Sequence, residues 1–205
     1  MLNFSQTTIY SSFCVVLPCL IYFIIKRRKN SKSYWIFVLL FVLYLWQVYD
    51  LTGVGGLTDI IYAPKGGIDQ PIIRARINLV PFTNIEKTFY LNILMLIPFG
   101  FLVPLIWKNY RKAYKTAILG AGFSLLIELS QLITTRTTDI DDLITNTLGA
   151  LLGFIIWKIF FKNHLKETEN SKRDVIVYIL LSFLGMFFLY YPFWFSDNIA
   201  SIILG

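Results

Sequence analysis

The sequence predicts an all-α protein, a polytopic bundle of about six transmembrane helices. Hydrophobic residues make up 56% of its 205 residues and charged residues only 15%, with a mean hydropathy of +0.63. Soluble domains average about 25% charged residues. The apolar residues also gather in runs that approach the roughly 20 helical residues needed to cross a bilayer. These two observations exclude the soluble, disordered and fibrous classes.

Six apolar runs are expected to cross the membrane, with five crossings as the alternative. They cover residues 9–25, 34–51, 88–107, 116–133, 143–161 and 175–195. The fifth carries Lys158 near its end, where a long side chain can reach the interface. A signal peptide has its positive charge before the apolar core, whereas here the basic cluster follows the first run. We therefore expect the first span to be retained.

The placement of basic residues predicts the orientation. The chain has 19 Lys and Arg against 12 Asp and Glu, a net charge of +7. Segments 26–33, 108–115 and 158–174 hold most of the basic residues, and the first two hold no acid. The positive-inside rule assigns these segments to the cytoplasm and both termini to the outside. Because the charge lies between spans and not on a helix face with stacking aromatics, nucleic acid is excluded as a partner.

The segment between the second and third spans, residues 52–87, is expected to be a short ordered extracellular piece. Residues 57–62 predict a short interfacial helix, and the alternation of apolar and polar residues over 73–80 predicts an extended stretch. Thr83 and Glu86 have the spacing of a capping box, so the third helix is expected to begin near Asn84.

Glu128 is the carboxylate that lies deep inside a predicted span, five residues before Ile133 and so about 7–8 Å below the outer end. Such a group needs a partner or a water-filled cavity. Ser124 and Gln131 share its helix face. A second stripe follows in the fifth span at spacings of three and four residues: Asp139, Asp142, Asn146, Gly149 and Gly153. The two glycines predict close helix packing.

We expect these polar residues to form one site in the outer half of the bilayer. Its candidate members are Glu128, Gln131, Ser124, Asn92, Asn146, Asp139, Asp142 and Arg136, with Arg74, Arg76 and Asn78 from the outer segment able to close over it. Plainer roles stay open: helix capping by Asp139, a dipole interaction for Asp142, a surface ion pair for Arg136 and interhelical hydrogen bonds for the asparagines. No cofactor and no metal are expected, because Cys14 and Cys19 have no metal-ligand spacing.

These motifs occur in one order over residues 34–161, and their set resembles the VanZ-like family. They are Asn78-Leu-Val-Pro-Phe82, Asn92, Pro98-Phe-Gly100, Ser124-Leu-Leu-Ile-Glu128-Leu-Ser-Gln131, and Arg136 through Asp139, Asp142 and Asn146 to Gly149 and Gly153. The resemblance implies a four-span core at 34–161, flanked by an N-terminal span and basic loop at 1–33 and a basic loop and C-terminal span at 162–205. It also implies a multi-pass protein of the bacterial cytoplasmic membrane.

The family is named for a protein that gives low-level resistance to teicoplanin, a lipoglycopeptide that acts at the outer leaflet on a lipid-linked cell-wall precursor. The predicted polar site faces the same leaflet, and we therefore expect it to bind an amphiphile, either the antibiotic or a cell-wall lipid. Two alternatives stay open: an intramembrane enzyme that modifies a lipid-linked precursor, and a small proton-coupled transporter. Binding is favoured over catalysis, because no His lies near the site and no hydrolase or phosphate-loop motif occurs. A homodimer also stays open.

Overall fold

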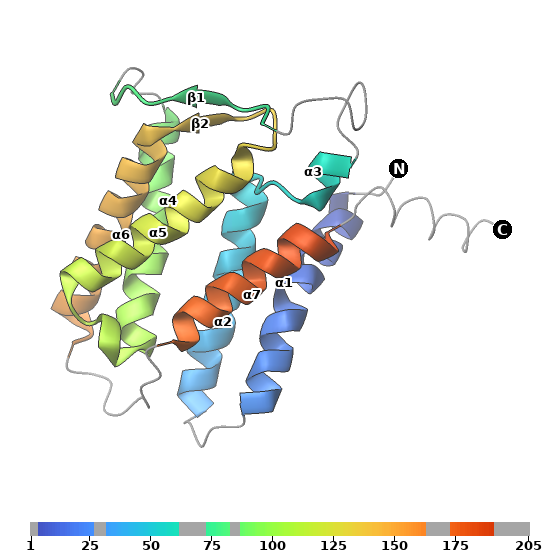
Figure 1. Cartoon of the computed structure of the whole chain (residues 1–205). Helices are drawn as coiled ribbons and strands as arrows, with labels where there is room; N and C mark the ends of the chain where they lie inside the picture. Colours follow the sequence, from blue (N-terminus) through green and yellow to red (C-terminus); the bar gives the residue numbers. More distant parts are fainter. Residues whose placement is uncertain (1–3, 27–31, 62–72, 83–86, 163–172, 191–205) are drawn as a thin grey trace.

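A computed structural model describes residues 4–26, 32–61, 73–82, 87–162 and 173–190 of the chain (Figure 1). The elements follow in this order: α1 (Phe4–Lys26), α2 (Lys32–Thr52), α3 (Leu57–Ile61), β1 (Arg76–Asn78), α4 (Lys87–Ile106), the 3-10 turn η2 (Lys108–Tyr110), α5 (Ala113–Gln131), β2 (Thr137–Asp139), α6 (Ile140–Phe160) and α7 (Asp174–Leu189). The predicted all-α bundle is confirmed.

Four helical segments are long and apolar enough to cross a membrane: α1, α2 with α3, α4 and α6. These run along the bundle, whereas α5 and α7 cross it obliquely (Figure 1). The helix α7 is apolar but has 16 residues within the described range. Helices occupy all six predicted runs, and six crossings stay a prediction. Thr83, Asn84 and Glu86, the predicted start of the third helix, lie outside the described residues, as do residues 191–195 of the sixth run.

Glycines let α4 and α6 approach backbone to backbone. A β-carbon added at Gly100 would overlap the carbonyl of Ala150, one at Gly149 the carbonyl of Ile93, and one at Gly153 the carbonyl of Ile97. Lipid tails are as apolar as leucine, so membrane helices associate through close packing and not through a hydrophobic driving force. The glycines therefore supply the contact surface that holds this helix pair together.

Aromatic side chains fill the space between α2, α4 and α5. Phe99 and Phe123 stack with ring centroids 5.1 Å apart, and Phe41 meets Trp107 edge to face at the same distance. All four are buried. The outer surface is apolar instead of polar: Ile25, Ile118 and Ile159 are 76%, 68% and 67% exposed. This inverted pattern fits a bundle whose surroundings are lipid.

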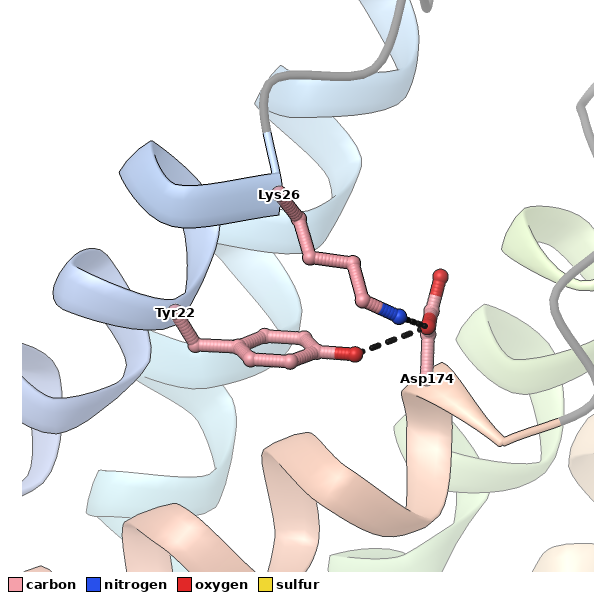
Figure 2. A network of polar contacts seen from close by, with 3 residues as sticks. All are labelled: Tyr22, Lys26 and Asp174. Carbon is pink, nitrogen blue, oxygen red and sulfur yellow. Dashed lines mark hydrogen bonds and ion pairs between the residues drawn. The ribbon is translucent and has the colours of Figure 1, made fainter.

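The helices α1 and α7 are joined by a polar contact. Figure 2 shows Tyr22 and Lys26 of α1 meeting Asp174, the first residue of α7. The Tyr22 hydroxyl donates to Asp174 Oδ1 at 2.9 Å, and Lys26 Nζ lies 3.2 Å from the same oxygen. Asp174 is only 4% exposed, so this ion pair compensates a buried carboxylate.

A two-stranded parallel sheet lies across one end of the bundle, over α4, α5 and α6 (Figure 1). Arg76 pairs with Thr137, Ile77 with Thr138 and Asn78 with Asp139. The extended stretch within 73–80 and the short helix at 57–62 were expected. The partner strand β2 was not predicted. Its three residues are too few to show an alternating pattern, and the pairing joins segments about 60 residues apart in the sequence.

The glycine contact predicts opposite effects for two Gly-to-Ala changes. Gly153→Ala should lower the free energy of unfolding by about 1–3 kcal/mol, because the added methyl overlaps the backbone of α4. Gly122→Ala on α5 is the control, since a β-carbon there meets nothing within 4 Å and alanine favours a helix by about 1 kcal/mol. Thermal unfolding of the purified variants in detergent measures both. Equal stability of the two variants would contradict the glycine argument.

Candidate functional site

Two carboxyl groups meet beneath the sheet. Glu128 of α5 is 6% exposed, and its carboxyl group lies beside that of Asp142 on α6. Glu128 Oε2 also accepts from the backbone N–H of Asp139 at 3.2 Å. Two carboxylates in one buried site repel each other, so such a pair favours a single proton between them. The pair is therefore arranged to hold one acid and one carboxylate.

Amide and hydroxyl groups extend the carboxyl pair toward α4 and deeper along α6. Asn92 Nδ2 donates to Asp142 Oδ1 at 2.5 Å, and Asn146 Nδ2 donates to Ser124 Oγ at 2.8 Å. Ser124 Oγ in turn donates to the carbonyl of Asp142 at 3.4 Å. Within the described residues, the buried Oδ1 of Asn146 has no partner. Asp142 and Asn92 are half-buried, so the cluster is partly accessible from outside the bundle.

The sheet and the first turn of α6 close the cluster from above. Asn78 Nδ2 donates to Asp139 Oδ2 at 3.0 Å, and Asp139 Oδ1 caps α6 by accepting from the N–H of Asp141 at 3.0 Å. Asp141 accepts from the N–H of Phe82 through both oxygens, at 2.8 and 3.0 Å. Phe82 has a φ of 61°, a backbone conformation that side chains disfavour. Asp141 thus holds a strained turn over the carboxyl pair.

Asp141 is the residue of this cluster that the sequence analysis missed. A favourable interaction with the helix dipole is enough to explain an acidic residue in the first turn of a helix, so its position gave no reason to include it. The signal that was available is the run Asp139-Ile-Asp141-Asp142, which holds more acids than one helix start requires.

Gln131 and Arg136 do not join the carboxyl cluster. Gln131 Nε2 and Arg136 Nη1 both donate to the carbonyl of Thr52 at the end of α2, at 2.8 and 2.7 Å. The Arg136 guanidinium also lies against Gly53, whose φ of 60° favours glycine. The predicted single site therefore divides in two, because these long side chains satisfy a helix C-terminus nearby.

The two arginines of segment 73–82 also differ. The Arg74 guanidinium donates to the carbonyl of Asp59 in α3, and its backbone N–H donates to the carbonyl of Leu132 at 2.9 Å, so it joins this segment to the end of α5. Arg76 on β1 is exposed. Exposed apolar side chains on β1, in the turn that follows it and in the first turns of α4 are together called here the apolar rim: Ile77, Leu79, Val80, Phe82, Tyr90 and Leu91. Within the described ranges, no group of three His, Cys, Asp or Glu could hold a metal ion.

Residues 34–161 match the model of a family described as VanZ/LLP1. A protein named Protein VanZ from Enterococcus faecium is 34% identical over 109 residues, which cover 51% of this chain and 66% of that protein. The alignment thus spans slightly less than two thirds of that relative. No solved structure matches the chain. The matched range runs from α2 to α6 and contains both polar clusters, whereas α1 and α7 lie outside it.

The shared acceptor predicts coupling between Gln131 and Arg136. Gln131→Ala and Arg136→Ala should each lower the free energy of unfolding by about 0.5–1.5 kcal/mol. The double variant should lose more than the sum, because only then does the Thr52 carbonyl lack both donors. Reversible unfolding of the purified wild type, the two single variants and the double variant gives the four free energies of unfolding for this double-mutant cycle. Arg76→Ala is the control, and additive losses would contradict a shared role.

Proposed function

Since the chain belongs to the VanZ/LLP1 family, we propose that it contributes to teicoplanin resistance through a site that binds an amphiphile at the outer leaflet. The ligand is the lipoglycopeptide itself or a lipid-linked cell-wall precursor. One observation carries the proposal: the Glu128–Asp142 pair, which Asn92 joins through Asp142, lies at the same end of the bundle as the exposed apolar rim. A polar cluster beside an apolar surface suits a ligand that has both kinds of group.

Each part of the cluster has a role in this proposal. The Asp142 carboxyl group and the side-chain Oδ1 of Asn146 accept hydrogen bonds from N–H and O–H groups of the ligand. The Asn92 side chain donates a hydrogen bond to an oxygen of the ligand. Three further residues position these groups from behind. Glu128 lies beside Asp142 and accepts from the N–H of Asp139 at the start of α6, and Asn78 of β1 donates to the Asp139 carboxylate. The apolar rim receives an acyl chain, and the exposed Arg76 meets an anionic group of the ligand.

The proposed orientation follows from the charges at the two ends. The sheet and the carboxyl cluster lie at the end of the bundle where α4 and α6 begin (Figure 1). The basic segment that joins α4 to α5 lies at the opposite end, together with Lys158 near the end of α6. The positive-inside rule assigns basic ends to the cytoplasm, so the carboxyl cluster is expected at the outer leaflet and both termini outside.

A second candidate function is supported by the proton that the carboxyl pair favours. One acid beside one carboxylate is a set that can donate and accept protons in turn, as general acid–base catalysis requires. The protein would then modify a lipid-linked envelope precursor within the membrane. Mass analysis of the lipid-linked precursors distinguishes this candidate: a product that forms with the wild type and disappears with Glu128→Gln supports catalysis over binding.

The first proposal predicts that Glu128→Gln and Asp142→Asn each abolish most of the protection against teicoplanin. Leaving a buried polar group without its hydrogen-bond partner costs about 1–3 kcal/mol, which weakens binding by about 5-fold to 150-fold. The measurement is the teicoplanin and vancomycin susceptibility of a sensitive Gram-positive host that expresses each variant at equal membrane levels.

Asp50→Asn is the matched control, because Asp50 is an exposed carboxylate at the end of α2. We expect this variant to protect like the wild type. Protection that survives both changes in the carboxyl pair would refute the site, and absence of protection by the wild type would refute the resistance role of this chain.

A further inference from the structure

A basic pocket of about 390 Å³ opens at the end of the bundle opposite the sheet. It lies between the start of α5 and the last turn of α6. Its lining includes the cations Arg111, Lys112, Lys158 and Lys162 and the aromatic rings of Phe154 and Trp157. No carboxylate lines it, within the residues that the structure describes. The pocket thus gathers positive charge around a hollow that has aromatic walls.

The Arg111 guanidinium is held in place without a carboxylate partner. Its Nε donates to the carbonyl of Pro104 at 3.1 Å, and its centre lies 5.4 Å from the Trp157 ring. Among the described residues, none of the four cations of the pocket forms an ion pair. Burial lowers the pKa of Arg111 below its usual value, as expected for a desolvated cation. The remaining guanidinium N–H groups are therefore available to an anion.

Backbone and indole groups add hydrogen-bond donors at the pocket. The helix α5 begins after Lys112, whose side chain makes no cap, so the first N–H groups of the helix have no side-chain acceptor from the cap position. Trp157 is 2% exposed, and its indole Nε1 lacks a partner among the described residues. Free N–H groups at a helix start favour negative charge.

The rule that places basic residues on the cytoplasmic side explains a positive loop, but it requires neither a cavity nor a fixed guanidinium. A planar guanidinium with three lysines nearby suits the charge and the oxygen atoms of a phosphate group. We propose that the basic pocket binds a phosphate group, carried by an anionic membrane phospholipid. Ile159 and Phe160, 67% and 63% exposed in the last turn of α6, offer apolar surface for the acyl chains of such a lipid.

Native mass spectrometry of the purified full chain in detergent tests the proposal. The probes are phosphatidylglycerol, which is anionic, phosphatidylcholine, which is zwitterionic, and inorganic phosphate. The wild type should retain phosphatidylglycerol in preference to phosphatidylcholine, and K158Q/K162Q should retain it on the order of tenfold less. The matched control is K32Q/R173Q, which removes two cations from the starts of α2 and α7 at the same end of the bundle. The control should behave like the wild type.

The outcomes separate the sources of the phosphate. Retention of phosphatidylglycerol that inorganic phosphate does not displace assigns the site to a phospholipid, whereas displacement assigns it to free phosphate. An equal loss in both double variants would show that net charge alone attracts the lipid, and this would overturn the proposal. Absence of binding of either probe to the wild type would also overturn it. Thermal unfolding of each variant confirms that the compared proteins are folded.

Discussion

The close contact between α4 and α6 is the constraint on which the rest of the structure depends. Gly149 lies against the carbonyl of Ile93, and Asn92 and Asp142 are the polar residues just above this contact toward the sheet. Two helices separated by larger side chains would hold Asn92 and Asp142 too far apart to form a hydrogen bond. The glycines thus determine the geometry of the polar cluster as well as the stability of the helix pair.

The carboxyl pair depends next on the sheet. A buried Glu128 without partners would be strongly unfavourable in a membrane bundle. Its partners are the N–H of Asp139, where β2 meets α6, and Asp142 in the first turn of α6. Asn78 on β1 binds Asp139, and Asp141 binds the strained turn at Phe82. Three residues of strand pairing therefore connect segment 73–82 to a carboxyl group on α5.

Hydrophobic runs and helical spacing predict the helices and the polar faces, because these properties are local. The position of Glu128, Asp142 and Asn146 on inward-facing stripes follows from spacing alone. The hydrogen-bond partners of Gln131 and Arg136 cannot be predicted from spacing. Both bind the backbone carbonyl of Thr52, and a carbonyl has no signature in the sequence. Pairing of β1 with β2 escapes prediction for a similar reason, because it joins segments that are distant in the chain and too short for a period.

The helix α6 connects the two ends of the molecule. Its dipole favours the acidic residues at its start and the basic residue at its end. Its first turn holds Asp141 and Asp142, where the partial positive charge of the helix dipole stabilises carboxylates. Its last turn holds Lys158, where the partial negative charge stabilises a cation. Between them, Gly149 and Gly153 present a flat apolar surface to α4 at the depth where charge would be most costly. A single membrane helix can therefore carry an acidic cluster at one end and a basic pocket at the other, since the intervening packing fixes both against the same neighbours.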